Sequence, residues 1–142
     1  MILVDANLLI YAIDSDAAHH AKARKWLEAT LSGSAQVGMS WVALLAFLRI
    51  TTHPRAMRRP IKPDAAMAYV DEWLALPSVD LVAPSDRHWA ILKNLIGGTG
   101  TGGNLTTDAH LAALAIEHGY AIASADNDFR RFPGLRFINP IA

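Results

Sequence analysis

The sequence predicts an α/β protein, a three-layer α/β/α sandwich around a central, mostly parallel sheet of roughly five strands. Short apolar runs alternate along the chain with segments whose apolar residues recur at helical spacing. Stretches rich in proline or glycine separate these segments without dividing the chain in two. A length of 142 residues suits one domain with a substantial core, so we predict a single domain over residues 1–142.

Five apolar runs are the predicted strands. Each is short, and Ile2–Val4 lacks the polar alternation of a half-exposed strand, which is typical of a strand buried in a parallel sheet. They lie near Ile2–Val4, Gln36–Gly38, Val79–Val82, Tyr120–Ala123 and Arg136–Ile138.

Helical spacing fills the intervals between these runs. A helix is expected directly after Asp5, and the apolar stretch Trp41–Leu48 is expected to be a buried helix because it is too short to cross a bilayer. Two segments break the pattern. The segment His53–Pro63 has three prolines, four cations and no acid, which predicts a loop, and Gly97–Asn104 is expected to be a flexible connection. Further helical repeats comprise Ala23, Trp26, Leu27 and Leu31; Ala66, Val70, Trp73 and Leu74; and Trp89, Leu92 and Ile96.

Composition narrows the functional classes. The formal net charge is zero, so any site for a polyanion must come from local charge or from a bound metal. The absence of cysteine excludes disulfides and thiolate metal ligands and agrees with a reducing compartment. No basic leader or membrane segment is recognisable, and we expect a cytoplasmic protein without membrane contact.

Three acids stand where strands end or helices begin. Asp5 directly follows the first predicted strand, Asp108 opens a helix, and Asp126 follows the run Tyr120–Ala123, with Asp128 two residues further on. The carboxyl ends of parallel strands form the usual ligand crevice of an open α/β sheet, so these side chains are expected to meet there. Carboxylates that meet repel one another unless one takes up a proton or a cation joins them. Oxygen ligands alone favour a hard ion, Mg²⁺ or Mn²⁺.

Each acid taken alone also has a structural interpretation. Asp108 would complement a helix dipole, Asp126 would cap the segment that contains Phe129, and Asp5 would form an Asx-type turn. These alternatives stay open for any single acid. The occurrence of all three at one predicted sheet edge favours the metal site.

Several polar residues are candidates for supporting roles. Asn7 would orient Asp5 or a water, or else be a polar residue in the first turn of a helix. Thr107 and Ser124 would hold a water or a phosphate oxygen, although helix capping is the simpler role for both. Arg49 would bind an acid or a phosphate, or only complement the end of its helix. The cations of the proline-rich loop would track a nucleic-acid backbone, bind a partner or simply be exposed: Arg55, Arg58, Arg59 and Lys62.

Other catalytic motifs are absent from the sequence. No Gly-Lys-Ser/Thr follows the glycine run, no His-Glu-x-x-His zinc motif occurs, and no serine lies in a Gly-x-Ser-x-Gly elbow. His110 and His118, on one predicted helix, are expected to pack or be solvated and not to ligate a metal.

Three motifs resemble the PIN domain family. Val4–Tyr11 is similar to the opening of a PIN domain, Gly103–Ala115 to its central acidic helix, and Ser124–Phe129 to its late acidic turn, which continues through Phe132–Leu135. The motifs occur in the family order and span essentially the whole chain. The group that the chain resembles most is the VapC-type toxins of bacterial toxin–antitoxin pairs.

The resemblance implies a Mg²⁺-dependent endoribonuclease that is restrained by a cognate VapB-type antitoxin and that forms a homodimer. Carried over by position, Asp5, Asp108 and Asp126 would be the metal-binding carboxylates. Asn7 would be a nearby polar support, and Ser124 would match the small hydroxyl residue of the late motif.

One position departs from the family pattern. A glutamate is usual about six residues after the serine that opens the third helix, and counting from Ser40 reaches Ala46, whereas the following arginine is present as Arg49. The loss either weakens the metal site or removes a second one, and Asp128 is a candidate replacement ligand.

Two other functions remain open. One is a non-catalytic module that binds RNA or a protein through the basic loop, which the alanine at position 46 keeps open. The other is a haloacid-dehalogenase-like phosphatase with Asp5 as nucleophile. That class usually carries a second aspartate where this chain has Asn7, so we rank it below the nuclease.

Overall fold

A five-stranded, all-parallel sheet forms the centre of the computed structural model, which describes residues 1–100 and 102–142. The strand order is β3-β2-β1-β4-β5, so the predicted α/β class is confirmed. Each strand lies within one residue of its predicted bounds. The strands are β1 (Ile2–Val4), β2 (Val37–Met39), β3 (Val79–Leu81), β4 (Ala121–Ala123) and β5 (Phe137–Ile138).

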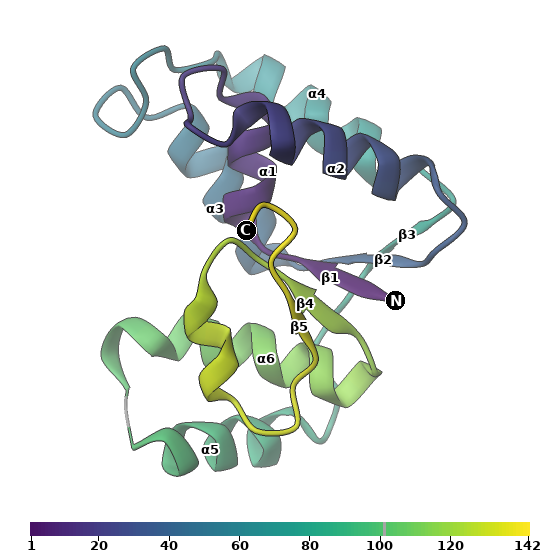
Figure 1. The fold of residues 1–142 in the computed structure, drawn as a ribbon, viewed down its shortest axis with the longest axis vertical. Coiled ribbons are helices and arrows are strands. Elements are labelled where there is room, and N and C mark those ends of the chain that lie inside the picture. The colour runs from purple at the N-terminus through teal and green to yellow at the C-terminus, as the bar shows by residue number, and fades with distance from the viewer. Residues whose placement is uncertain (101) are drawn as a thin grey trace.

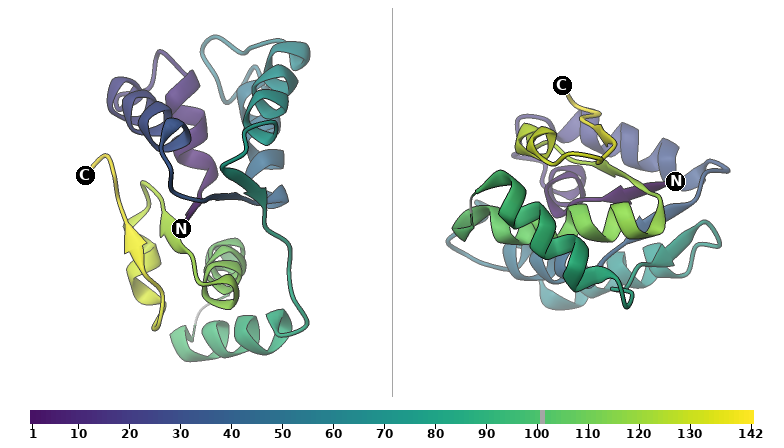
Figure 2. Two further views of the ribbon diagram at one scale, coloured as in Figure 1. Left: turned by 90° about the vertical axis from the view of Figure 1, so that its right-hand side faces the viewer. Right: turned by 90° about the horizontal axis from the view of Figure 1, so that it is seen from below.

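Helices cover both faces of this sheet and complete the predicted three layers (Figure 1). One side of the sheet is covered by α1 (Ala6–Ile13), α2 (His20–Ser32), α3 (Trp41–Thr51) and α4 (Pro63–Leu74). The other side is covered by α5 (His88–Thr99), α6 (Thr106–His118) and a short 3₁₀ helix, η2 (Asn127–Arg131). The turned views show the two layers of helices (Figure 2).

The core is divided by the sheet into two apolar clusters. Val4 and Met39 belong to the cluster under α1 to α4, whereas Leu3 and Ile122 belong to the cluster with α5 and α6. Neighbouring residues of a strand point to opposite faces, so a strand that is apolar at every position contributes to both clusters. This explains why β1 and β4 appear in the sequence as continuous apolar runs.

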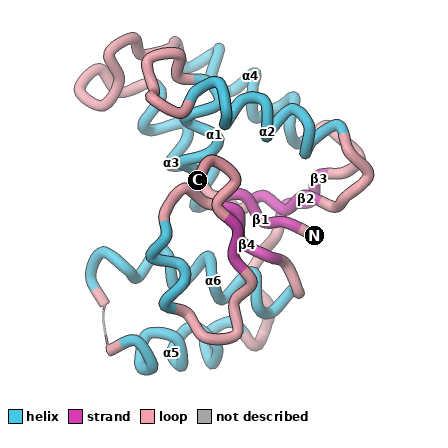
Figure 3. Tube along the Cα trace, viewed as in Figure 1, coloured by secondary structure: helices cyan, strands magenta, loops and turns pink. Residues whose placement is uncertain are grey.

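Polar residues at the ends of strands start the helices that follow. Asp5 accepts a hydrogen bond from the backbone N–H of Ala6 at the start of α1, and Ser40 accepts one from Ala43 at the start of α3. Such caps satisfy backbone donors that a helix leaves free in its first turn. Both turns lie at the carboxyl edge of the sheet. A long loop over residues 52–62 then joins α3 to α4 (Figure 3).

The prediction of a flexible connection over Gly97–Asn104 is partly wrong. Gly97 and Gly98 belong to the last turn of α5, which continues to Thr99, and Gly103 opens a second 3₁₀ helix, η1 (Gly103–Leu105). Leu95 is buried against α6, so packing outweighs the weak helix propensity of glycine. The helix ends at Gly100, whose φ of 66° is the left-handed conformation common after a helix. Thr101 lies outside the described residues.

Strand order reverses beside β1. The chain adds β2 and β3 on one side of β1 and then returns to place β4 and β5 on the other. In open α/β sheets, ligands bind in the crevice at the carboxyl ends of the strands at such a switch point. The residues that follow β1 and β4 are Asp5 and Ser124.

Among the described residues, no helix has the length and apolar character needed to cross a bilayer.

Candidate active site at the carboxyl edge of the sheet

Asp5 joins the ends of the two strands at the switch point. Its backbone N–H donates to the carbonyl of Ala123 on β4 at 3.0 Å. One carboxylate oxygen, Oδ1, accepts from the N–H of Ala6 at 2.7 Å, and the other, Oδ2, accepts from the Ser124 hydroxyl at 2.7 Å. Oδ1 keeps a further lone pair for a ligand, whereas Oδ2 also lies 3.4 Å from a second donor, Asn7 Nδ2. Asp5 is therefore a helix cap as well as a candidate ligand.

Ser124 is the centre of the polar contacts beneath Asp5. Its side chain is fully buried, and its Oγ accepts from Asn7 Nδ2 and from the N–H of Asp126, both at 3.0 Å. Ser124 therefore orients carboxylates and does not cap a helix, so the simpler role weighed from the sequence is wrong. Asn7 also helps to hold Asp5 and the residues after Ser124 in place. Its Oδ1 accepts from the N–H of Ala125 at 3.1 Å, and its Nδ2 lies 3.4 Å from Asp5 Oδ2.

The late acidic turn is also ordered by its own side chains. Asp126 caps η2, and its Oδ1 accepts from the N–H of Asp128 at 2.9 Å. Asp126 therefore has the capping role considered from the sequence, and its charge also acts on Asp5. Asp128 is about half exposed and lies 3.6 Å from Arg131, so a cation already faces this acid. Its use as a replacement ligand stays a prediction.

A pocket of about 480 Å³ opens between α3 and α6 beside Asp5. Asp108 and Thr107 line it from the first turn of α6, and Arg49 lines it from the last turn of α3. Ala46 lies on the same wall, so position 46, where the resemblance implied a glutamate, does face the acids. The methyl group of Ala46 leaves the pocket with one carboxylate fewer than the family pattern. We call this the acid pocket.

Burial, followed by repulsion between acids, raises the pKa values of Asp5 and Asp108. Burial contributes most to the raised pKa of Asp108, about 6 against an ordinary 3.8, followed by the charges of Asp5, Asp126 and Asp128. Burial also raises the pKa of Asp5, opposed by the hydrogen bonds from Ser124 and Ala6. The four acids are therefore within electrostatic reach of one another, as the sequence predicted.

The same acids do not form a closed metal cage. Over residues 1–100 and 102–142, no three His, Asp or Glu side chains are gathered closely enough to enclose a cation. Mg²⁺ rarely requires such a cage, because it keeps several waters and usually takes one or two protein carboxylates together with substrate phosphates. Asp5 and Asp108, which share the acid pocket, with Asp126 close by, fit an open site of this kind.

The basic loop lies outside the acid pocket. Arg55, Arg58 and Arg59 are exposed, and Lys62 immediately precedes α4. Arg59 pairs with Asp16 at 3.4 Å. Of the predicted cations, only Arg49 lines the acid pocket.

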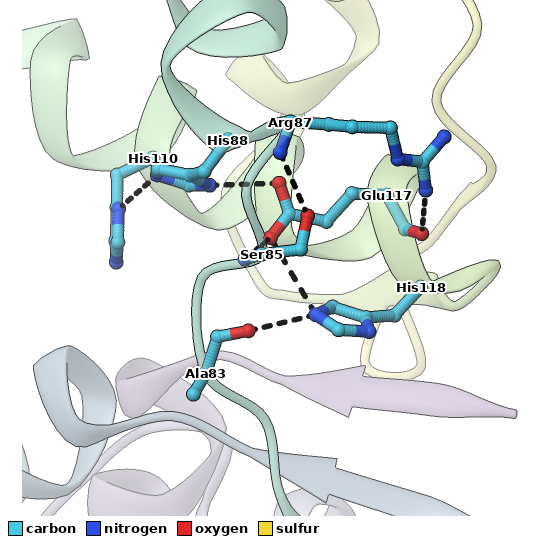
Figure 4. A network of polar contacts seen from close by, with 7 residues as sticks. All are labelled: Ala83, Ser85, Arg87, His88, His110, Glu117 and His118. Atoms are coloured by element: carbon cyan, nitrogen blue, oxygen red, sulfur yellow. Dashed lines mark hydrogen bonds and ion pairs between the residues drawn. The ribbon is translucent and has the colours of Figure 1, made fainter.

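A second polar network, not predicted from the sequence, joins α5 to α6 (Figure 4). The Glu117 carboxylate is fully buried and accepts from the N–H of Ser85 at 2.8 Å and from His88 Nδ1 at 2.9 Å. His88 Nε2 lies 2.9 Å from His110 Nδ1, and His118 Nε2 lies 3.5 Å from the same carboxylate. His110 packs against the His88 ring and His118 is exposed, as expected from the sequence, but their polar contacts were not predicted.

The sequence held only a faint signal of this network. His110 and Glu117 lie seven residues apart, which places them on one face of α6. Their partners Ser85 and His88 belong to a distant segment, and only the packing of α5 on α6 brings the two sets together.

A further pocket of about 470 Å³ lies on the side of the molecule that α2 and α4 cover. Leu27, Leu31 and Trp73 are among its lining residues, and none of the four clustered acids reaches it. We therefore place the chemistry in the acid pocket.

Comparison with known proteins identifies the family. The PIN domain family model matches residues 2–135. The chain is 48% identical over 142 residues to Ribonuclease VapC37 of Mycobacterium tuberculosis (strain ATCC 25618 / H37Rv), covering 100% of this chain and 99% of the relative. It is 41% identical over 141 residues to Ribonuclease VapC33 of the same strain, covering 99% of each chain. The chain therefore belongs to the PIN domain family, and these relatives place it in the VapC group.

Solved structures agree with the fold. VapBC2 from Rickettsia felis, solved bound to a DNA fragment from its promoter, aligns with a TM-score of 0.70 over 98% of this chain and 98% of that chain. Its sequence is 17% identical, so this likeness concerns the architecture alone.

Proposed function

We propose that this protein is a Mg²⁺-dependent endoribonuclease and the toxin of a VapBC-type toxin–antitoxin pair. The observation that carries the proposal is the convergence of Asp5, Asp108 and Asp126 at the switch point of the sheet, with the pKa values of Asp5 and Asp108 raised. Relatives over the full length of the chain bear the name ribonuclease VapC. Mn²⁺ is expected to substitute for Mg²⁺, because both prefer oxygen ligands.

The reaction we infer is hydrolysis of an RNA phosphodiester bond. Asp5, Asp108 and Asp126 would hold Mg²⁺, and the ion would supply positive charge that offsets the carboxylates, polarises a phosphate and activates a water for in-line attack. Ser124 and Asn7 hold Asp5 in one orientation through the contacts described above. The Arg49 guanidinium, at the wall of the acid pocket, is suited to bind a phosphate oxygen.

Two partners belong to the proposal. A cognate VapB-type antitoxin is inferred from VapC kinship, and several similar solved structures are themselves VapBC complexes. A homodimer is inferred from α3, where Trp41 and Leu45, one turn apart, are 53% and 58% exposed. Apolar side chains gathered on one helix face are typical of protein contacts. We expect the protein to act on RNA in the cytoplasm.

The test is cleavage of a structured RNA by purified protein that is free of antitoxin. Reactions contain Mg²⁺, Mn²⁺ or EDTA, and the Asp5→Asn variant is compared with wild type and with Asp71→Asn. Asp71 is an exposed acid on α4 that does not line the acid pocket, so its variant controls for the loss of one charge. We expect cleavage with either metal by wild type and by Asp71→Asn, and none by Asp5→Asn or in EDTA.

Folded, antitoxin-free protein that cuts no RNA with any metal would contradict the nuclease. The alanine at position 46 would then explain the lack of cleavage, because it removes one family carboxylate from the acid pocket. RNA binding that survives Asp5→Asn under those conditions would favour a non-catalytic binding module.

A further inference from the structure

A second hollow adjoins the acid pocket and has the opposite charge. It measures about 370 Å³ and lies where the last turn of α3 meets the basic loop. We call it the arginine hollow; it is lined by Arg49, Ile50, His53, Arg55 and Ala56. No acid lines it among the described residues, in contrast to the acid pocket.

Arg49 connects the two sites. Its side chain lines the acid pocket together with Asp5 and Asp108, and it lines the arginine hollow together with Arg55. A chain that lies across Arg49 would therefore contact both sites without crossing another element. Over the part of the chain that the structure describes, neither the Arg49 nor the Arg55 guanidinium forms an ion pair or a hydrogen bond, so both are available to a ligand.

The loop that carries Arg55 has a defined shape. Met57 is buried, and its N–H donates to the carbonyl of His53 at 3.1 Å. The N–H of Arg55 donates to His53 Nδ1 at 3.0 Å, and the N–H of Ile61 donates to the carbonyl of Thr51 at 2.9 Å. These contacts keep Arg55 at the wall of the hollow.

The other loop arginines are placed differently. Arg59 turns toward Asp16, with which it forms an ion pair, and Arg58 does not line the hollow. The four cations of this loop are therefore not equivalent, although they look alike in the sequence. Arg55 is the loop cation that faces the hollow next to the acids.

The two arginines beside the acid pocket would offset the repulsion between its carboxylates and a phosphodiester. Clustered carboxylates repel a phosphodiester, and the zero net charge of the chain supplies no general attraction for a polyanion. Arg49 is the one cation among the residues that line the acid pocket within the described chain. Arginine is suited to phosphate because its planar fork presents parallel N–H donors to two oxygens.

We propose that the arginine hollow is a subsite that binds a backbone phosphate of the RNA strand next to the phosphate held in the acid pocket. Arg55 and Arg49 donate to its oxygens, and the strand passes over Arg49 from one site to the other. This inference rests on the proposed ribonuclease function, because it takes RNA as the ligand.

The experiment measures RNA binding without cleavage. A labelled single-stranded oligoribonucleotide is titrated against antitoxin-free Asp5→Asn protein in Mg²⁺ by fluorescence anisotropy, over a series of salt concentrations. Arg55→Ala, Arg58→Ala and Lys25→Ala are each added to this background. All three remove one exposed cation, but Arg58 does not line the hollow and Lys25 lies on α2.

We expect Arg55→Ala to weaken binding about 10-fold near 0.1 M salt and to lower the slope of log affinity against log salt by about 0.7, the value of one contact to a single-strand phosphate. Lys25→Ala should leave both quantities unchanged, and Arg58→Ala should cost less than a third of the effect of Arg55→Ala. In the cleaving protein, Arg55→Ala should raise KM and leave kcat within about 2-fold, because it removes binding outside the reacting phosphate.

Two results would overturn the subsite. Equal losses from Arg55→Ala and Arg58→Ala would mean a diffuse charge effect of the loop. Unchanged RNA binding by Arg55→Ala together with weaker binding of a co-expressed antitoxin would assign the hollow to a protein partner. The proposed ribonuclease function is tested separately, because it fails if wild-type protein cleaves no RNA. The subsite fails or stands on the comparison of RNA binding among Arg55→Ala, Arg58→Ala and Lys25→Ala.

Discussion

The buried carboxylate of Glu117 and the carboxylates of the acid pocket differ in how their negative charge is compensated. Glu117 is fully buried, and each of its oxygens accepts from a donor, with His88 beside it. Asp5 and Asp108 face an open pocket, and after burial the charges that raise the pKa of Asp108 are those of other acids. A buried carboxylate that is fully paired serves the fold, whereas uncompensated carboxylates in a pocket mark a site that expects a ligand.

The difference has a physical origin. Burial of an unpaired charge costs several kcal/mol, so a core carboxylate persists only where donors surround it. The acid pocket avoids most of this cost through partial exposure, and it keeps Asp5 in place with neutral donors from Ser124 and Asn7. Neutral donors orient the carboxylate without cancelling the charge that a cation needs.

The largest expected effect is on catalysis. Asp108→Asn removes one charge from the acid pocket while keeping the shape of the side chain, so cleavage should fall by about 1,000-fold, on the order of 4 kcal/mol of barrier. Initial rates on one RNA in saturating Mg²⁺ measure this. Asp71→Asn is the matched control, and a loss below about 10-fold for Asp108→Asn would show that this acid is not part of the reacting site.

The second effect is on stability and concerns the paired carboxylate. Glu117→Gln places an amide donor against Ser85 or His88, both of which already donate, so the free energy of unfolding should fall by about 3 kcal/mol. Urea unfolding measures the loss, with Glu28→Gln as control.

Glu28 forms an exposed pair with Arg24, and its variant should change the free energy of unfolding by no more than about 0.5 kcal/mol. Equal effects of the two variants would mean that Glu117 is not structural. At a temperature where Glu117→Gln is fully folded, its cleavage rate should match wild type, which would sharpen the contrast between the two groups.

Ser124→Ala is expected to affect both stability and activity, because Ser124 supports the acids from within the core. Loss of its hydroxyl leaves the N–H of Asp126 without its acceptor and costs about 1–2 kcal/mol of stability. It also removes a hydrogen bond that lowers the pKa of Asp5, so metal affinity should fall by about 10-fold or more.

Metal titration followed by thermal unfolding measures both effects in one experiment. Ser32→Ala, which removes an exposed hydroxyl at the end of α2, is the control. Unchanged metal affinity in Ser124→Ala would mean that the hydroxyl does not support the carboxylates.

The smallest effect is the pH dependence of stability. The pKa of Asp108 is about 6 in the folded protein, above its ordinary 3.8, so the folded state binds this proton more tightly than the unfolded chain. Its contribution to stability is complete below pH 3.8 and is lost as the pH rises through about 6. Because Asp108 is only half-buried, we expect a loss of about 1 kcal/mol.

Urea unfolding in EDTA at about pH 4.5 and about pH 7.5 tests this, with the difference between wild type and Asp108→Asn isolating the one group. The variant should gain on wild type at the higher pH. A difference that does not change with pH would mean that Asp108 is not repelled by its neighbours.

The sequence alone determined the parallel sheet and the acids at its carboxyl edge. Continuous apolar runs such as Ile2–Val4 form strands buried on both faces, and Asp5 follows its strand by covalent connection. These features depend on the local pattern of residues, so the sequence alone can predict them. The bounds shifted by a residue, as with Gln36–Gly38 against the observed Val37–Met39, because the hydrogen-bond register between strands sets them.

Only the tertiary structure decided how side chains from distant segments meet. Ser124 binds Asp5 across 119 residues of sequence, and His88 reaches Glu117 across 29, and neither separation has a local signature. α3 and α6 cover opposite faces of the sheet, and both line the acid pocket at its carboxyl edge, which places Ala46 on the pocket wall. The fold of the basic loop put Arg55, and not Arg58, at the hollow. Contacts of this kind depend on the relative placement of whole elements, which the burial of two apolar clusters fixes only when the chain has folded.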